Sequence, residues 1–289
     1  EAAADADVVS IRVTLYRTDR DSRIVAALRE ARARGKEVAV LLELKASFDE
    51  QRNIEWAREL EQDGIRISFS PVRFKVHAKT ALVVRREEGT LRRYAYIGTG
   101  NLNASTARSY VDLGLLTCDA VLTREVGAVF NLLTGNSGGG EIRRLVVAPF
   151  DMRRRLLQLI ERETQLARDG RPARIRLQLN GLADRRLIGA LYRASQAGVR
   201  VEMMVREICA LRPGVPGVSD NITVVSVVGR LLQHARILHF HNAGDDEYFI
   251  GSADWRPRNL SERVEVVTPI DEPEHRALLD QILTDTLGD

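Results

Sequence analysis

Val76-His77-Ala78-Lys79, and a weaker copy of it, His234-Ala235-Arg236, are the stretches of this sequence that decide how the rest is interpreted. In a β-strand, residues two apart point to the same face, so the histidine and the cation of each stretch are expected to project together. Imidazole is nucleophilic near neutral pH, and a neighbouring cation stabilises phosphoryl oxygens. Each stretch therefore suits attack on phosphorus better than it suits an ordinary protein core.

The sequence after each histidine is repeated as well. An apolar run comes first, and a second strand then ends in glycine, a hydroxyl residue, a small residue and Asn or Asp. The two endings are Gly98-Thr99-Gly100-Asn101 and Gly251-Ser252-Ala253-Asp254. Small residues at a strand end let backbone N–H groups approach an anion, and the hydroxyl adds a donor. Two copies in the same order are a much stronger signal than one.

The repeat extends along the whole chain. A strand, a helix and a strand are expected at 11–17, 24–33 and 38–44, and again at 175–179, 187–197 and 201–205. The offset between copies falls only from 164 (175 minus 11) to 157 (234 minus 77). Self-similarity over so long a period indicates a duplicated domain rather than a solenoid, and alternating strands and helices favour α/β layers.

The remaining elements follow from periodicity and from end signals. Gly35 and Gly198 stop the first helix of each copy, and Asp21-Ser22 resembles a cap before the first one. Further helices are expected at 53–63, 121–133, 150–167 and 272–287, and a further strand at 65–70. The glycine-rich run 135–140 is interpreted as a linker, which predicts domains at residues 1–143 and 144–289.

Composition sets broad limits. A chain of 289 residues, 44% apolar and 29% charged, fits two globular domains of about 150 residues each. The net charge of +3 permits polyanion binding without requiring it, and nucleic acid is not an expected partner. Cys118 and Cys209 form no disulfide framework or metal-ligand spacing, which fits a reducing cytoplasm. No apolar stretch reaches the roughly 20 residues of a membrane span, and the acidic N-terminus is not a signal peptide.

Several motifs together carry a family resemblance. They are Thr14-Leu15-Tyr16-Arg17, His77-Ala78-Lys79, Gly98-Thr99-Gly100-Asn101, Thr106-Ala107-Arg108-Ser109-Tyr110-Val111-Asp112, Ser219-Asp220-Asn221, Ser252-Ala253-Asp254-Trp255 and Arg258-Asn259-Leu260. With them the chain resembles the C-terminal catalytic half of the long, phosphohistidine type of bacterial polyphosphate kinase. The resemblance implies an α/β fold of two tandem, duplicated phospholipase D-like domains, each a mixed β-sheet flanked by helices. We also expect a piece of a longer protein that forms a homo-oligomer.

The resemblance implies a role for each candidate residue. His77 is the autophosphorylated nucleophile, which takes the γ-phosphate of ATP and passes it reversibly to inorganic polyphosphate, leaving ADP. His234 is the second essential histidine, in acid/base work or phosphate contact. Lys79 and Arg236 are expected to clamp phosphate, because they recur in the repeat.

Further residues are expected around the nucleotide. Tyr110 and Arg206 match ATP-contacting positions, and Asn101, Arg108 and Arg258 are additional candidates for ATP or phosphate binding. Arg17 and Ser47 match a magnesium–phosphate cluster. Since arginine is not a sensible Mg²⁺ ligand, Arg17 is interpreted as holding the phosphates that hold the metal.

Two departures from the family pattern affect the site. Ser47 stands where the family has an arginine, and Glu207 places a carboxylate beside Arg206. Ser47 can still bind through its hydroxyl or a water, and Arg73 or Lys75 can replace the lost charge. The departures concern the rate and the phosphate donor rather than the type of reaction.

Two other functions stay open. A phospholipase D-like phosphodiesterase uses the same histidine chemistry, but that family expects an aspartate soon after His-x-Lys, and residues 80–85 contain none. A non-catalytic polyanion-binding remnant would fit Ser47 and Glu207, yet the two histidines and Lys79 are intact. His239 and His241 invite a metal site; with no carboxylate or cysteine at a matching spacing, we interpret them as core or solvated histidines.

Overall fold

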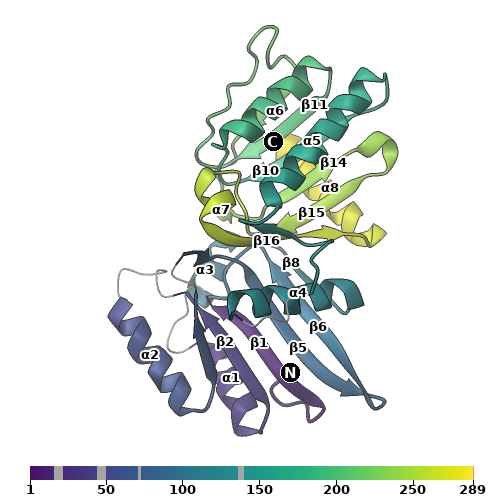
Figure 1. Cartoon of the computed structure of the whole chain (residues 1–289). Helices are drawn as coiled ribbons and strands as arrows, with labels where there is room; N and C mark the ends of the chain where they lie inside the picture. The colour runs from purple at the N-terminus through teal and green to yellow at the C-terminus, as the bar shows by residue number, and fades with distance from the viewer. Residues whose placement is uncertain (16–21, 44–49, 71–72, 136–139, 289) are drawn as a thin grey trace. The chain divides into compact units, whose positions relative to one another are not determined.

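The chain folds into two compact units, and Figure 1 shows the computed structural model, which describes residues 1–15, 22–43, 50–70, 73–135 and 140–288. Unit 1 comprises Glu1–Ser109 and Gly114–Leu145, and unit 2 comprises Tyr110–Leu113 and Val146–Asp289. The segment Tyr110–Leu113 thus belongs to unit 2, although it lies in the first half of the sequence. The boundary expected between residues 143 and 144 stays a prediction.

Unit 1 contains a mixed sheet in the order β3-β2-β1-β5-β6-β8, in which β1, β2 and β3 are parallel and the other neighbours antiparallel. Its strands are β1 Val8–Leu15, β2 Glu37–Leu42, β3 Arg66–Phe69, β5 Lys79–Glu87, β6 Thr90–Gly98 and β8 Gly114–Thr117, and the short β4 Lys75–Val76 precedes β5. Its helices are α1 Arg23–Ala33, α2 Glu50–Gln62, α3 Ala104–Ala107 and α4 Ala120–Leu133.

Alternation along β1 assigns the helices of unit 1 to the two faces of the sheet. Ile11, Val13 and Leu15 point to one face, where they form a core with buried residues of α1 and α2. Arg12 points to the other face, where its Nη1 donates a hydrogen bond to Asn131 Oδ1 of α4 at 3.0 Å. Helices α1 and α2 therefore cover one face, and α4 packs on the opposite face against β5 and β6.

Unit 2 repeats this topology. Its sheet has the order β12-β11-β10-β14-β15-β16, with β10, β11 and β12 parallel, β10-β14-β15-β16 antiparallel, and β9 paired to β16. The strands are β9 Val146–Ala148, β10 Arg174–Leu179, β11 Arg200–Val205, β12 Ile222–Val225, β14 Ile237–Phe240, β15 Glu247–Gly251 and β16 Arg263–Ile270. A separate two-stranded pair joins β7 Tyr110–Val111 to β13 Leu232–Gln233 in parallel.

The helices of unit 2 lie on both faces of its sheet. They are α5 Met152–Arg168, α6 Arg185–Gln196, α7 Pro257–Ser261 and α8 Pro273–Gly288, with a 3-10 turn η2 at Asn242–Gly244. Helices α5 and α6 share a core with Ile175, Leu177 and Leu179 of β10. Arg176 points to the other face and contacts α8. The expected fold, an α/β duplication with a mixed sheet flanked by helices in each copy, is confirmed.

The element ends agree well with the end signals in the sequence. Gly35 and Gly198 follow the first helix of each copy with φ angles of 80° and 96°, a backbone conformation that glycine adopts without a steric penalty. Ser22 occupies the N-cap position of α1, but its side chain makes no capping hydrogen bond. The linker expected at 135–140 falls mostly outside the described residues. No described helix combines the length and apolar content that a bilayer crossing requires.

The expectation that each catalytic-candidate histidine lies inside a strand is wrong. His77 lies in the break between β4 and β5, and His234 lies in the break between β13 and β14. In both copies the long strand begins after the histidine, at Lys79 or just beyond Arg236. The strand-periodicity argument therefore applies to the residues that follow each histidine, and each histidine is held by separate contacts.

Candidate active site

In unit 1, the His77 segment is fixed to β1 through one threonine. Thr14 Oγ1 donates to the carbonyl oxygen of Ala78 at 2.8 Å and accepts from the Thr80 backbone N–H at 2.9 Å. On the other side of the histidine, Glu43 Oε2 accepts from the Val76 N–H at 2.6 Å. Because both flanks are tied to the buried sheet, the backbone of His77 has little freedom.

His77 and Lys79 are both buried, with 8% and 3% of their surfaces exposed. The Lys79 ammonium donates a hydrogen bond to the carbonyl oxygen of His77. The cation therefore lies directly beside the histidine backbone. A buried ammonium close to a nucleophile favours a negatively charged reactant.

The strand-end motif after β6 is also buried. Thr99 is 0% exposed, and the side-chain oxygen of Asn101 is buried without a hydrogen-bond partner among the described residues. Such an acceptor is available for a group that enters the site, such as a protonated ring nitrogen. An added Cβ at Gly98 would lie 2.4 Å from the Tyr96 hydroxyl, so a larger residue there would require the Tyr96 ring to shift. Gly251 is its counterpart, where a Cβ would lie 2.4 Å from the Val266 carbonyl oxygen.

In unit 2, His234 is held by a carboxylate and a guanidinium. Its ring Nδ1 lies 2.8 Å from Asp112 Oδ1, and Arg236 Nη1 lies 3.2 Å from ring Nε2. The Tyr110 ring is 4.9 Å from the His234 ring, centroid to centroid, and tilted by 50°. The pairing of β7 with β13 brings Tyr110 and Asp112 to this place, since His234 directly follows β13. Tyr110, His234 and Arg236, three of the residues singled out in the sequence, therefore lie together within unit 2.

Arg236 is itself fixed by the end of β15. Its Nε and Nη2 donate to both carboxylate oxygens of Asp254 at 3.2 and 3.0 Å, in a pair whose side chains are only 5% and 10% exposed. Asp254 also accepts from the Asn180 N–H at 2.8 Å, and the Asn180 side-chain amide donates to the carbonyl oxygen of His234 at 3.0 Å. The strand-end Asp254 thus positions the cation of the His-x-Arg pair.

Arg206 joins the same set of contacts through Asn180. Its Nε donates to Asn180 Oδ1 at 2.6 Å, and its Nη2 pairs with Glu207 Oε1 at 2.7 Å. The departure noted in the sequence therefore has a direct structural effect, because Glu207 occupies part of the Arg206 fork. The Glu207 side chain is 47% exposed, so solvent weakens this pair.

Arg258 lies near this group at the start of α7. Partial desolvation and the positive charges of Arg256 and Arg263 lower its pKa, while the carboxylates of Asp254 and Glu207 act in the opposite direction. The three arginines form an electropositive patch suited to phosphate. Arg108 is exposed and makes no hydrogen bond or ion pair within the described residues. Arg17 and Ser47 lie outside the described residues, so the predicted magnesium–phosphate cluster stays a prediction.

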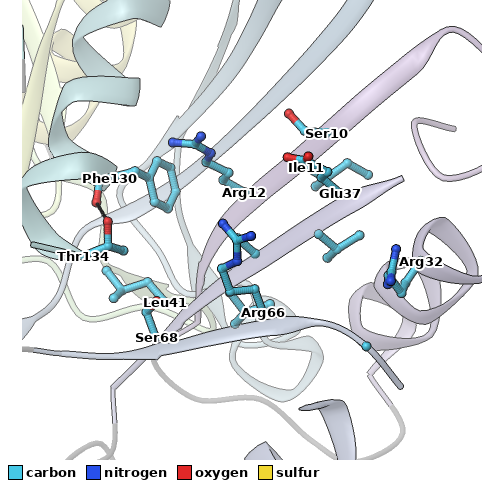
Figure 2. Close-up of a pocket in the computed structure, with 14 residues that line it drawn as sticks. Ser10, Ile11, Arg12, Arg32, Glu37, Leu41, Arg66, Ser68, Phe130 and Thr134 are labelled. Carbon is cyan, nitrogen blue, oxygen red and sulfur yellow. Dashed lines mark hydrogen bonds between the residues drawn. The ribbon is translucent and has the colours of Figure 1, made fainter. Parts of the chain in front are cut away.

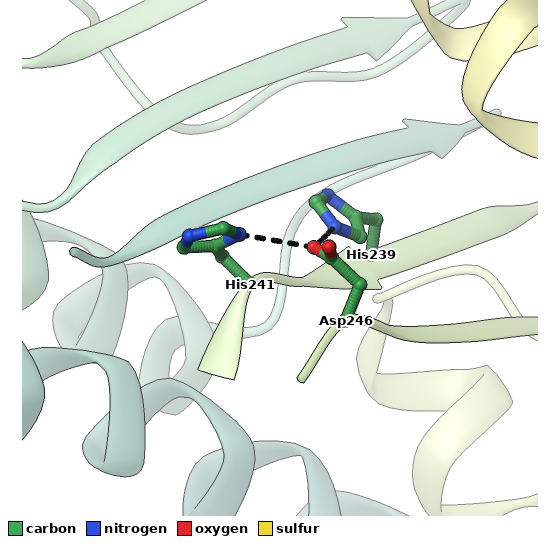
Figure 3. Close-up of side chains that lie close together, drawn as sticks. All are labelled: His239, His241 and Asp246. Carbon is green, nitrogen blue, oxygen red and sulfur yellow. Dashed lines mark hydrogen bonds and ion pairs between the residues drawn. The ribbon is translucent and has the colours of Figure 1, made fainter. Parts of the chain in front are cut away.

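The expectation that no carboxylate reaches His239 and His241 is wrong. Asp246 Oδ1 lies 2.5 Å from His239 Nε2 and 3.0 Å from His241 Nδ1, in a group that could hold a metal ion (Figure 3). However, the Nε–H of Arg176 donates to His239 Nδ1 at 3.0 Å. Burial lowers the pKa of His239 to about 4, so the ring is neutral and its proton sits on Nε2. That tautomer donates to Asp246 and offers no lone pair to a metal, which favours a structural hydrogen-bond network.

Three residues that position the site were not predicted as site residues from the sequence. Asn180 belongs to no motif, and Glu43 begins the family stretch that contains Ser47 but has no role assigned to it there; the positioning role of each is identified only by its contacts. Asp112 was noted as a member of a motif but not assigned to a site. Its spacing of two from Tyr110 was the available signal, since residues two apart on an extended segment share a face.

Comparison with known proteins follows the same division of the chain. The family model described as Polyphosphate kinase C-terminal domain 1 matches residues 1–138, and that of C-terminal domain 2 matches residues 145–289. The chain belongs to the polyphosphate kinase family. The polyphosphate kinase of Thermosynechococcus vestitus is 53% identical over 288 residues, which are 100% of this chain and 39% of that protein.

Solved structures agree with the family assignment. A polyphosphate kinase from Porphyromonas gingivalis matches with a TM-score of 0.92 and 41% identity, over 100% of this chain and 44% of that one. A phosphatidylserine synthase from Haemophilus influenzae matches with a TM-score of 0.66 over 99% of this chain and 82% of that one, and its 12% identity makes this a likeness of fold alone. The tandem phospholipase D-like fold is confirmed. The chain spans about two fifths of the polyphosphate kinases that it matches.

Proposed function

We propose that this chain carries the catalytic residues of a polyphosphate kinase, which reversibly moves the γ-phosphate of ATP to inorganic polyphosphate through a phosphohistidine. Membership of the polyphosphate kinase family supports the reaction. The observation that carries the proposal is the duplicated histidine–cation pair, buried in the first copy and partly buried in the second, and fixed in each copy by its own hydrogen bonds. A histidine and a cation held in fixed positions by hydrogen bonds are expected where a nucleophile attacks phosphorus.

The first step forms the phosphohistidine. A lone pair on the His77 ring attacks the γ-phosphorus of ATP, an N–P bond forms, and the bond from that phosphorus to the bridging oxygen breaks. ADP leaves with the bond's electron pair. Lys79 stabilises negative charge on the phosphoryl oxygens. The buried side-chain oxygen of Asn101, which has no partner among the described residues, is proposed to accept the ring N–H during the reaction and so to orient the imidazole.

The second step regenerates the histidine. A terminal oxygen of polyphosphate attacks the phosphorus, the N–P bond breaks, and the chain gains one phosphate. The steps run in either direction, because both involve similar phosphoryl bonds.

His234 is proposed to contact phosphate and to transfer a proton to or from it. Asp112 accepts a hydrogen bond from Nδ1–H, so the ring lone pair is on Nε2, where we propose that phosphate replaces Arg236 Nη1, now 3.2 Å away. Arg236, held by Asp254, adds a fixed positive charge beside it. Tyr110, Arg206 and Arg258 are proposed to bind the nucleotide or its phosphates.

Magnesium is proposed to enter with the nucleotide. The residues assigned to its cluster, Arg17 and Ser47, offer no carboxylate, and Mg²⁺ prefers carboxylate and phosphate oxygens. A metal site made by this chain alone does not fit that donor set, whereas phosphate-bound Mg²⁺ held through arginine does. Bound in this way, the ion neutralises charge on the transferred phosphate.

The test is incorporation of acid-labile, base-stable phosphate from γ-labelled ATP with magnesium, with polyphosphate as a parallel donor. We expect label in the wild type that chases into polyphosphate or ADP, no label in His77→Ala, and strongly reduced turnover in His234→Ala. His275→Ala is the matched control, because His275 is exposed on α8. Wild-type label in His77→Ala would overturn the proposal, and cleavage of a phosphodiester would instead establish the hydrolase.

A further inference from the structure

A cavity of about 470 Å³ lies in unit 1, lined by residues of β1, β2 and β3, by Phe130 and Thr134 at the end of α4, and by Arg32 at the end of α1. It is lined by three arginines, Arg12, Arg32 and Arg66, with the hydroxyl residues Ser10, Ser68 and Thr134 and a single carboxylate, Glu37 (Figure 2). Its volume lies in the range of small-molecule sites, roughly 300–1,000 Å³. None of these residues is among those assigned to phosphoryl transfer.

The shape of the cavity follows from strand pairing. Arg12 of β1 is paired with Ala39 of β2, and Ala39 with Arg66 of β3, so the three form one row across the sheet. Two strand spacings separate the Cα atoms of the arginines by roughly 10 Å. The small Ala39 side chain leaves the hollow between them, and Figure 2 shows both guanidinium groups on the same side of the sheet.

None of the three arginines has a carboxylate partner within the described residues. Arg12 donates to the neutral amide oxygen of Asn131, and Arg32 Nη1 lies 3.5 Å from the Lys36 carbonyl oxygen. No hydrogen bond or ion pair to a described residue is formed by Arg66. Three guanidinium groups with one exposed carboxylate leave a local excess of positive charge that an anion would neutralise.

The second copy shows how the same row looks when its charge is neutralised by protein. Arg176 is the counterpart of Arg12, and its register partner on β11 is Glu202 instead of an alanine, although the Glu202 carboxylate itself binds Arg174 and Arg200. Beyond Glu202 the row ends in Thr223 rather than an arginine. The Arg176 guanidinium also bonds Asp280 of α8. In unit 2 the Arg176 charge is thus balanced by Asp280, whereas in unit 1 neither Arg12 nor Arg66 has a carboxylate partner among the described residues and only the exposed Glu37 lines the cavity. An anion from outside the row would balance the charge of unit 1.

We propose that this cavity is a holding site for inorganic polyphosphate, binding a run of its phosphates apart from the residues that transfer them. The identity of the ligand rests on the proposed function. A run of phosphates fits better than a single ion, because three guanidinium forks spread over the cavity offer more donors than one phosphate accepts. Hydroxyls of Ser10 and Ser68 add uncharged donors, whereas the Thr134 hydroxyl donates to the Phe130 carbonyl oxygen at 2.9 Å.

The test measures binding of long-chain polyphosphate to the 289-residue chain by fluorescence anisotropy. Arg12→Gln combined with Arg66→Gln should weaken binding at least tenfold and lower the slope of log affinity against log salt by about two. Arg93→Gln, an exposed arginine of β6 outside the cavity, should change affinity less than twofold. Glu37→Gln should strengthen binding severalfold. Equal affinities of the double variant and Arg93→Gln, with both folded by circular dichroism, would overturn the proposal.

Two further experiments distinguish this site from the transfer site, and polyphosphate from other polyanions as its ligand. With long chains as acceptor, the double variant should raise the KM and leave kcat unchanged, and with triphosphate as acceptor it should match the wild type. Loss of binding in the double variant would support the cavity even if no phosphohistidine formed, so the two proposals can fail separately. Single-stranded RNA should bind weakly and equally to all variants. Loss of RNA binding alone in the double variant would reassign the cavity to RNA.

Discussion

Asp112 illustrates how one side chain can set the state of another. Its carboxylate lies 2.8 Å from His234 Nδ1, so it favours the tautomer with the proton on Nδ1 and stabilises the ring when it carries a second proton. Asp112→Asn should lower kcat about 10- to 100-fold with little change in the KM for ATP, because ring orientation and basicity are lost while nucleotide contacts remain.

The role of Asp112 is tested by measuring both the magnitude of kcat and its dependence on pH. The acidic limb should move in Asp112→Asn and stay in place in Asp245→Asn, which removes an exposed carboxylate from the turn after η2. If the profile keeps its shape and only the protein's stability falls, Asp112 has a structural role alone.

Glu207 leads to a prediction with the opposite sign. It occupies one branch of the Arg206 fork at 2.7 Å, which leaves that arginine less available for phosphate. Glu207→Gln should therefore lower the KM for ATP, because it frees the Arg206 guanidinium for phosphate. The decrease should be only about two- to tenfold, because the ion pair that is removed is half exposed and weak. Glu262→Gln, an exposed carboxylate after α7, is the control. An unchanged or higher KM in Glu207→Gln would mean that Arg206 does not contact the nucleotide.

At the scale of elements, periodicity and end signals predicted most helices and strands to within a few residues. They failed at His77 and His234, where strand-like spacing continues through a break in the strand. The break depends on contacts distant in sequence, such as Thr14 with Ala78 and Val111 with the His234 N–H, and a local pattern does not contain these. The same limit explains why Asn180 and Glu43 were missed.

Helix α8 is joined to its sheet by a network that should be sensitive to acid. Arg176 and Tyr248 both bond Asp280 of α8, and Arg176 also bonds His239, whose other nitrogen meets Asp246. Burial lowers the pKa of His239 from 6.5 to about 4. Between these values the unfolded chain binds a proton that the folded chain does not, so the free energy of unfolding falls as pH drops from 6.5 to 4.

This linkage amounts to about 2 kcal/mol of lost stability by pH 5. The pKa values of Asp246 and Asp280 are lowered, because their hydrogen bonds outweigh burial, and their contributions are lost only at lower pH. Urea unfolding at pH 7 and pH 5 should show the loss in the wild type and in His275→Asn, and a much smaller loss in His239→Asn. An equal loss in all three would place the acid sensitivity elsewhere.

On the scale of the whole molecule, the duplication was visible in sequence because both copies keep the same order of elements. The differences between copies were not visible, since they depend on which residues face one another across strands. Arg12 and Arg176 occupy equivalent places, yet one row continues to Ala39 and Arg66 and the other to Glu202 and Thr223. Only the pairing of residues across neighbouring strands reveals that the two rows differ in charge.

Metal dependence is also a property of the whole reaction. Since Arg17 and Ser47 supply no carboxylate, Mg²⁺ should bind through the phosphates of ATP. Calorimetric titration of Mg²⁺ into the chain without nucleotide should give no measurable binding, and the rate should follow the concentration of the Mg²⁺–ATP complex. Tight binding of Mg²⁺ to the chain alone would contradict this and point to a carboxylate site.

The segment Tyr110–Leu113 determines where the chain can be divided without damage to unit 2. It lies in the first half of the sequence, yet it belongs to unit 2 and supplies the carboxylate partner of His234. A polypeptide made from Val146 onward would lack both β7 and Asp112. The two halves of the sequence therefore cannot be exchanged or expressed as independent modules without separating His234 from its carboxylate partner.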